Sequence, residues 1–300
     1  MISYAQNHED VLLERCFRDQ ERGFYIDVGA WDPITDSVTQ HFYARGWNGI
    51  NVEPVTEFFE RLELQRPRDV NLQCILGDRI GTRALNVIEG SGLSTTRDLD
   101  ASFIEDLAGI GFAMEVVEVR ETTLAEICAE HVPNGAEIDF LKVDVEGAEA
   151  DVLRGANWKL DRPRVLVIEA IRPVVMNINA PLPKAVDASI GWEPPLLESG
   201  YLFAATDGVN RFYVREEDAV LLEHFRVPVN VLDLYVPYTT WVAEQEAATA
   251  RGELVVAEQA ARELEARNRE GDQRIAELLA SKSWVLTAPM RVISEWLRRM

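Results

Sequence analysis

The chain has 300 residues and a formal net charge of −21, with 51 acidic residues against 30 basic ones. Such an acidic excess argues against nucleic acid as a partner, because phosphate contacts require surplus Lys and Arg. Hydrophobic residues make up 47% of the chain, which supports a packed core and excludes disorder over most of its length. The three cysteines lack metal-site spacing, and neither a signal peptide nor a membrane-spanning run is visible, so we expect a cytoplasmic protein.

Apolar runs alternate with helix-like segments between residue 24 and about residue 214. The predicted strands are 24–28, 49–53, 71–76, 140–143, 165–169, 201–206 and 211–214. Helices are predicted within 55–64 and 122–131, the second with Thr122 or Thr123 as its N-cap. This alternation predicts an α/β fold with a doubly wound, mostly parallel sheet. The turn "TDGVN" at 206–210 predicts an antiparallel hairpin for the last two strands.

The stretch "FYIDVGAWDP" (24–33) ends the first predicted strand. A dinucleotide-binding loop would continue G-x-G-x-x-G, but here Gly29 stands alone beside the acidic Asp27. Glu53 ends the second strand, where a carboxylate suits the two hydroxyls of a ribose. S-adenosylmethionine (AdoMet) carries a ribose and a sulfonium cation but no phosphate. A single-glycine turn near carboxylates therefore favours AdoMet over a nicotinamide cofactor.

The stretch "DFLKVDVEGAEADVLRG" (139–155) places three ionisable residues at the end of a buried strand. Side chains alternate along a strand, so we expect Lys142, Asp144 and Glu146 on one face, near its carboxyl end. Such a group is a candidate for acid–base chemistry. The alternative is a purely structural ion pair between Lys142 and Asp144.

These motifs resemble the FkbM family of AdoMet-dependent methyltransferases. The resemblance covers roughly residues 2–236 and is carried by "SYAQNHEDVLLERCF", "GFYIDVGAWDPITDSVTQHFYARGWNGINVEP", "IDFLKVDVEGAEADVLRG", "RPRVLVIEA" and "GYLFAATDGVNRFYV". It implies a class I, Rossmann-like methyltransferase that methylates a hydroxyl oxygen, often on sugars, glycolipids or polyketides. The cofactor-binding residues that we predict on this basis are Asp27, Gly29, Ala30, Glu53, Asp78 and Lys142, with Glu53 on the ribose and Asp78 near the adenine.

A sugar hydroxyl is a weak nucleophile, so a positioned base would help to remove its proton. We predict Asp144 as that base, then Glu146, and then His8, whose segment "QNHED" is a candidate lid. The carboxylates of Asp144, Glu146 and Glu169 are an alternative Mg²⁺ site. We do not favour metal dependence, and predict no metal site.

Two smaller features leave two interpretations each. Ser37 and Thr39 either reach the cofactor carboxylate or cap the following helix, and we favour capping. Asn210 and Arg211 contact either the acceptor or the sheet edge. Two competing functions also remain, a nicotinamide-dependent oxidoreductase and a non-catalytic scaffold. The loops 90–115 and 177–195 are expected to determine which acceptor is bound.

The composition changes after about residue 240, so we predict a catalytic domain over 1–240, a helical segment over 241–280 and a basic tail over 281–300. A weak heptad is visible in Leu254, Ala261, Asn268 and Ile275, and in Ala257, Leu264, Gly271 and Leu278. Two interpretations of this segment remain open. It is either an interaction helix or short coiled coil, which could form a homo-oligomer, or a solvated helix docked on the domain.

The tail "SKSWVLTAPMRVISEWLRRM" carries four basic residues and one acidic residue beside two tryptophans. This pattern is typical of a helix on an anionic membrane surface, although packing against a protein is an equal alternative. Its segment "SKSWVLTAPMR" is similar to a short segment of bacterial surface-polysaccharide enzymes. That similarity favours a glycan or glycolipid acceptor at the inner face of the membrane, with a polysaccharide-assembly partner.

Overall fold

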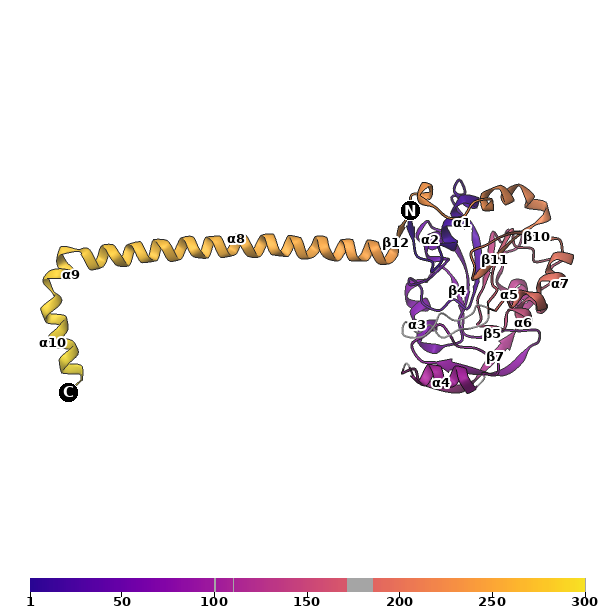
Figure 1. The fold of residues 1–300 in the computed structure, drawn as a ribbon, viewed down its shortest axis with the longest axis horizontal. Helices are drawn as coiled ribbons and strands as arrows, with labels where there is room; N and C mark the ends of the chain where they lie inside the picture. The colour runs from indigo at the N-terminus through magenta and orange to yellow at the C-terminus, as the bar shows by residue number, and fades with distance from the viewer. Residues whose placement is uncertain (100, 110, 172–185, 300) are drawn as a thin grey trace. The chain divides into compact units, whose positions relative to one another are not determined.

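The computed structural model describes residues 1–99, 101–109, 111–171 and 186–299. The chain divides into two compact units, Met1–Tyr238 and Thr239–Met300, and each is described by itself (Figure 1). Among the described residues, no helix combines the length and the apolar character needed to cross a lipid bilayer.

The first unit contains a seven-stranded sheet in the order β10-β11-β9-β8-β2-β3-β4. Its strands are β2 (Phe24–Val28), β3 (Asn48–Val52), β4 (Val70–Leu72), β8 (Phe140–Val143), β9 (Val165–Glu169), β10 (Tyr201–Thr206) and β11 (Asn210–Arg215). Five of them run parallel, whereas β11 is antiparallel to β9 and to β10. The predicted α/β fold with a mostly parallel sheet is confirmed.

Helices cover both faces of this sheet, because its central strands are apolar on both sides. On one face, Ile26 and Leu141 pack with residues of α5 (Leu124–His131), α6 (Glu149–Arg154) and α7 (Glu193–Glu198). On the other face, the alternate residues Tyr25 and Phe140 pack with residues of α1 (Glu9–Phe17) and α2 (Gln40–Ala44). The helix α3 (Thr56–Gln65) follows β3. Thr123 caps α5 as predicted, since its side chain accepts a hydrogen bond from the Glu126 amide.

A second sheet was not predicted from the sequence. It contains β5 (Ile75–Leu76), β6 (Gly81–Ile88) and β7 (Met114–Thr122), in the order β5-β7-β6. The single strand predicted over 71–76 is wrong, because the chain leaves the large sheet after Leu72 and enters the small one at Ile75. The residues of β6 and β7 are mostly exposed or half-buried, so these strands lack the continuous apolar run of the central strands. The helix α4 (Ala101–Gly109) lies between them in the chain.

The ends of the first unit pair with each other. The strand β1 (Ile2–Ser3) runs parallel to β12 (Val236–Pro237), and the Tyr4 ring lies 4.9 Å from the Tyr238 ring. Arg15 of α1 forms an ion pair of 2.7 Å with Asp233. The described part of this unit also contains 3₁₀ segments at Ser189–Gly191, Glu216–Phe225 and Val231–Asp233, and the second of them is interrupted by the non-helical Asp218.

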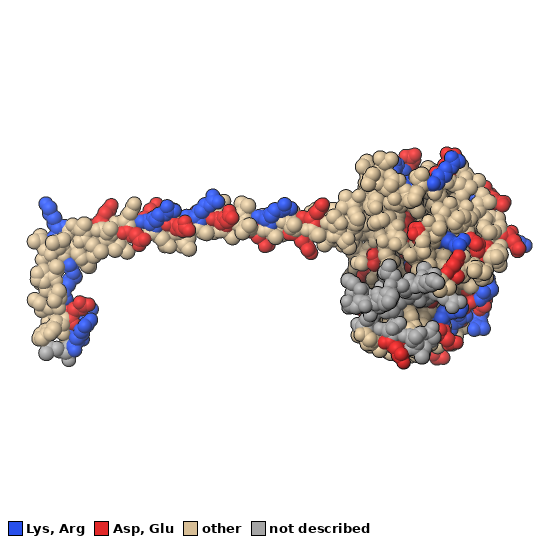
Figure 2. Space-filling view, in the orientation of Figure 1, with Lys and Arg blue, Asp and Glu red and all other residues tan. Residues whose placement is uncertain are grey.

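The described part of the second unit consists of helices and the short breaks between them. The helix α8 (Tyr238–Ala280) has 43 residues, and α9 (Lys282–Leu286) and α10 (Ala288–Arg298) follow it. None of the three helices has a buried residue. In the space-filling view, acidic and basic side chains alternate along α8 (Figure 2).

Candidate active site

The turn after β2 brings two strand ends into direct contact. Gly29 and Ala30 both donate their amides to the Val52 carbonyl, at 3.0 and 3.2 Å. Gly29 has a φ of +77°, and a Cβ added to it would lie 1.8 Å from the Asp144 carbonyl oxygen. Only glycine fits here, because any side chain would separate β2 from the segment that follows β8. The lone glycine of the sequence motif therefore serves a close backbone approach.

Lys142 stabilises the turn after β2 from inside the sheet. Its Nζ donates to the Gly29 carbonyl at 2.6 Å, and lies 3.4 Å from Asp27 and 3.5 Å from Asp144. Burial opposes the lysine charge, but the carboxylates of Asp27 and Asp144 outweigh it and raise the pKa of Lys142 above its ordinary value. The Lys142–Asp144 ion pair anticipated as an alternative is present, and Asp27 completes it.

Asp27 lies in the protein interior next to Lys142. Its side chain is almost fully buried, and one of its oxygens accepts a hydrogen bond of 2.9 Å from the Thr39 hydroxyl. The capping role favoured for Thr39 is wrong, because the Thr39 side chain makes no cap hydrogen bond to α2. Ser37 bonds to Thr39 and to the buried Arg66. These contacts fix Asp27, which in turn holds Lys142.

Glu53 follows β3 and faces the same turn. One of its oxygens accepts from the Trp31 amide at 2.9 Å and the other from the Val55 amide at 2.8 Å. Burial raises the pKa of the Glu53 carboxyl to about 7, although these two backbone hydrogen bonds lower it. Glu53 therefore changes charge close to neutral pH.

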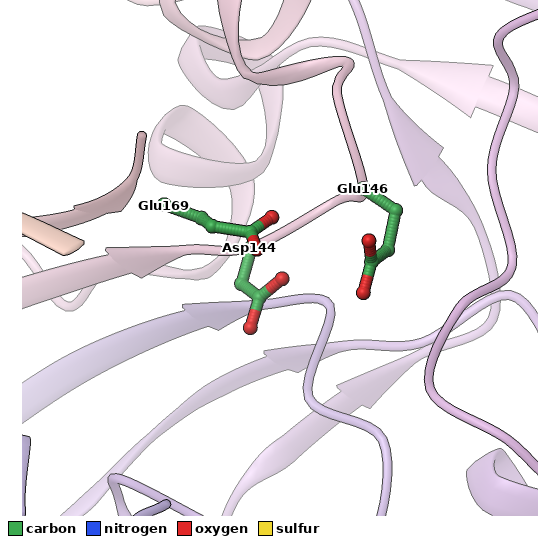
Figure 3. Close-up of side chains that lie close together, drawn as sticks. All are labelled: Asp144, Glu146 and Glu169. Carbon is green, nitrogen blue, oxygen red and sulfur yellow. The ribbon is translucent and has the colours of Figure 1, made fainter. Parts of the chain in front are cut away.

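Three further carboxyl groups converge on the neighbouring strand ends (Figure 3). Asp144 follows β8, Glu146 lies in the turn before α6, and Glu169 ends β9. One carboxylate oxygen of each lies within 4.8 Å of the others. Burial, and then the charges of Asp144, Glu146 and Glu149, raise the pKa of Glu169 to about 11, so that it is protonated at neutral pH.

The turn that carries Glu146 is held from two sides. Glu146 has a left-handed φ of 54°, and the next residue, Gly147, has a φ of 94°. The buried Glu149 accepts hydrogen bonds from the amides of Val145 and Gly147, at 3.2 and 2.9 Å. The Thr95 hydroxyl donates to the Glu146 carbonyl at 2.8 Å. The position of Glu146 is thus set by contacts with α6 and with the segment after β6.

These strand ends open into a pocket of about 240 Å³. Of the predicted site residues, Gly29, Ala30, Glu53, Lys142, Asp144 and Glu146 line it. Asp27 does not line it. Asp78 does not either, and its carboxylate lies 3.8 Å from Arg83 and 3.7 Å from Arg154. The pocket therefore brings together six of the nine predicted residues.

His8 is the third predicted residue outside the lining. Its ring hydrogen-bonds to the Ser3 hydroxyl at 3.0 Å and lies 4.6 Å from the Tyr235 ring. Its neighbours Gln6 and Glu9 line the pocket instead. The N-terminal segment thus contributes to the site, but not through its histidine.

Sequence reasoning left Asn210 open between the acceptor and the sheet edge, and it missed other lining residues. Asn210 of β11 lines the pocket and donates to Glu9 at 2.7 Å, which joins two segments 201 residues apart. Arg211 instead pairs with Asp187 and Glu193. The apolar part of the lining contains Phe58, Ile75, Leu76 and Leu85. Phe58 and Leu85 carried no recognisable signal, because an apolar residue in a helix or strand is usually part of a core.

A second cavity of about 590 Å³ adjoins the turn after β8. Part of its described lining comes from the two loops expected to determine the acceptor, with Arg97 and Asp98 from one and Asp187 and Trp192 from the other. The rest comes from the turn after β8 and the start of α6. Residues 177–185 of the second loop lie outside the described residues. Glu146 lines both cavities, so a molecule in the second cavity would meet one in the first at this residue.

The chain was also compared with known proteins. The model of the methyltransferase FkbM domain matches residues 27–182, which is more than half of the chain. The chain belongs to this family. The predicted resemblance is confirmed, and the protein is a methyltransferase of the FkbM family. No curated protein and no solved structure matches it at a significant level.

Proposed function

We propose that this FkbM methyltransferase uses AdoMet to methylate a hydroxyl oxygen on a sugar, a glycolipid or a surface polysaccharide. The observation that carries the choice of donor is the charge of the pocket. Its described lining contains one basic residue, Lys142, and the acidic residues Glu9, Asp36, Glu53, Asp144 and Glu146. A lining with this excess of carboxyl groups suits a ligand with a sulfonium and an ammonium group, and repels a diphosphate.

The described residues fit the parts of AdoMet. Glu53 stands at the strand end where a carboxylate accepts ribose hydroxyls, and the Gly29–Ala30 turn offers close backbone approach. Phe58, Ile75 and Leu76 give the lining an apolar part that suits an adenine ring. Asp27 and Lys142 support the turn from behind. The strand order, with its antiparallel β10 and β11, supports the Rossmann-like class I assignment.

The second cavity supports a sugar as acceptor. The charged groups of Arg97, Asp98 and Asp187 offer partners for hydroxyls, and Trp192 adds an aromatic side chain. This cavity meets the donor pocket at Glu146. An acceptor bound there is therefore adjacent to the carboxyl cluster that would take its proton.

AdoMet supplies a methyl group on a positively charged sulfur, and the S–CH₃ bond breaks as the O–CH₃ bond forms in line with it. The residues of the chain bind and orient both partners, and alignment provides most of the rate acceleration. The hydroxyl proton passes to a carboxylate of the cluster, with Asp144 as our first choice and Glu146 as the second. His8 is the weakest candidate, because it lies outside the lining of the pocket.

Two measurements separate this proposal from its alternatives. Calorimetry should detect AdoMet binding and no NAD binding, since the pocket lacks a phosphate cradle. Transfer of tritiated methyl from AdoMet to a panel of glycans and glycolipids should then yield labelled product. NAD binding without AdoMet binding would indicate an oxidoreductase, and binding of neither would indicate a scaffold.

For the C-terminal unit, we propose attachment to an anionic lipid surface. In α10, the exposed Met290, Ile293, Trp296 and Leu297 recur at helical spacing, and Arg291 and Arg298 lie on the opposite face. Basic side chains predominate in this segment, although the whole chain is strongly acidic (Figure 2). Basic charge beside interfacial tryptophan suits the headgroup region of an anionic lipid surface.

Sedimentation with vesicles tests this attachment. The full chain should pellet with anionic vesicles and stay in solution with neutral ones, and a chain without residues 281–300 should pellet with neither. An unchanged pellet after the deletion would refute the proposal. Self-association of the full chain in the absence of lipid would instead assign the apolar face to a protein contact.

A further inference from the structure

The carboxyl cluster Asp144, Glu146 and Glu169 contains three acidic groups, with few basic groups close to them. Among the described residues, Lys142 alone brings a basic group within 4.0 Å of it, and that group contacts only Asp144. Lys142 is also shared with Asp27 and with the Gly29 carbonyl. The carboxyl groups of Glu146 and Glu169 are therefore left without a basic partner in the described part of the chain.

Glu169 gives an independent indication that this cluster is a ligand-binding site. The residue is only 8% exposed, and its Oε2 atom is buried without a hydrogen-bond partner in the described structure. A buried carboxylate oxygen without a donor is costly, so such atoms are nearly always satisfied by protein, water or an ion. The side chain extends from the end of β9 toward Asp144 and Glu146 (Figure 3).

The spacing of the three groups suits a small divalent cation. Oxygens bound to Mg²⁺ at about 2.1 Å are about 3 Å apart when adjacent and about 4.2 Å apart when opposite. The cluster oxygens lie within 4.8 Å of one another, so small side-chain rotations close the set. Three carboxylates without His or Cys favour Mg²⁺ or Mn²⁺ over zinc.

We propose that Asp144, Glu146 and Glu169 bind one Mg²⁺ or Mn²⁺ ion, which holds the acceptor hydroxyl for methyl transfer. This role rests on the proposed function, whereas the binding site itself does not. Each ligand contributes one oxygen, and its second oxygen remains free to accept the hydroxyl proton. The cation attracts electron density from the hydroxyl, which makes its proton easier to remove. Metal dependence, which the sequence did not favour, thus becomes the expected behaviour.

Mn²⁺ binding to the full chain tests the site directly. Electron paramagnetic resonance measures the free Mn²⁺ in solution, in the absence of AdoMet and acceptor. The wild type should remove one Mn²⁺ per chain from solution, and excess Mg²⁺ should release it. Glu169→Gln keeps the shape of the side chain and should weaken binding about tenfold or more, as should Asp144→Asn. Glu130→Gln, at an exposed acid on α5, is the matched control and should bind like the wild type. Thermal unfolding of each variant checks that it is folded.

Equal Mn²⁺ binding by the wild type and by both folded cluster variants would overturn the proposal, as would no binding by the wild type. A methyl-transfer assay keeps the two proposals separate. Activity that a chelator removes and Mg²⁺ restores supports the catalytic role, whereas activity that resists chelation contradicts it. Specific Mn²⁺ binding without any methyl transfer would uphold the site and refute the proposed function.

Discussion

The two units of this chain use charged residues in opposite ways. In Met1–Tyr238, the buried Lys142 lies 3.4 Å from the buried Asp27, and removal of either partner would strand a charge in the protein interior. In α8, the pairs Arg262–Glu258 and Arg269–Glu265 are exposed and one helical turn apart. Such exposed pairs contribute only a few tenths of a kcal/mol each. Tertiary contacts therefore determine the backbone conformation in the first unit, whereas local helix propensity determines it in the second.

The largest change in the free energy of unfolding should follow the replacement of a glycine in the first unit. Gly29→Ala should destabilise the protein by roughly 3 kcal/mol or more, because it combines a left-handed backbone with a clash against the Asp144 carbonyl. Methyl transfer should be lost as well. Urea unfolding measures the effect. Gly208→Ala is the control, because Gly208 has a φ of +102° but open space around it, and it should cost about 1–2 kcal/mol.

If Gly29→Ala proves as mild as Gly208→Ala, the close approach of the β2 turn to Asp144 does not hold the site together.

The next effect is catalytic. Asp144→Ala should lower the methyl-transfer rate about 10²- to 10⁴-fold and change AdoMet affinity little, because the side chain acts on the acceptor. Initial rates and calorimetry measure the two quantities. Asp19→Ala, at an exposed position outside the pocket, should change neither. A parallel loss of AdoMet affinity would instead place Asp144 in the donor site.

A smaller effect concerns pH. The pKa of Glu53 is about 7, and AdoMet binding needs its ionised form to accept ribose hydroxyls. Affinity should therefore rise with pH and be about tenfold weaker at pH 6 than at pH 8. Calorimetry at a series of pH values measures it. In Glu53→Gln this dependence should flatten, which separates Glu53 from the amino group of AdoMet. An equally steep dependence in the variant would exclude Glu53 as its source.

The smallest predicted effect is a gain in stability, and it concerns the second unit. Gly252 lies inside α8 with nothing within 4 Å of an added Cβ. Gly252→Ala should stabilise the helix by about 1 kcal/mol, and so slow amide exchange nearby up to about fivefold. Hydrogen exchange of the full chain measures this protection. Unchanged or faster exchange would show that contacts other than local propensity govern α8.

The same contrast explains what the sequence could predict. The strands β2, β8 and β9 have the predicted bounds, because continuous apolar runs mark strands buried on both faces. The edge strand β10 also has the predicted bounds, although its residues are mostly half-buried or exposed. Gly29 and Glu53 were predicted at the site because strand ends in a parallel sheet meet at one edge. The hydrogen bond between Asn210 and Glu9 was not, since one sequence does not show which distant residues meet. Asp78 was placed by resemblance alone, and its arginine neighbours were not foreseen.

The shared position of Glu146 has a consequence for engineering. Because this residue lines both cavities, a substitution there changes the donor and acceptor environments at once. A library intended to alter the acceptor range would therefore spare Glu146 and vary Arg97, Asp98 and Ile190, which line the second cavity alone. New acceptors would then be selected while the donor pocket stays unaltered. Each newly accepted substrate could be attributed to changed contacts in the second cavity.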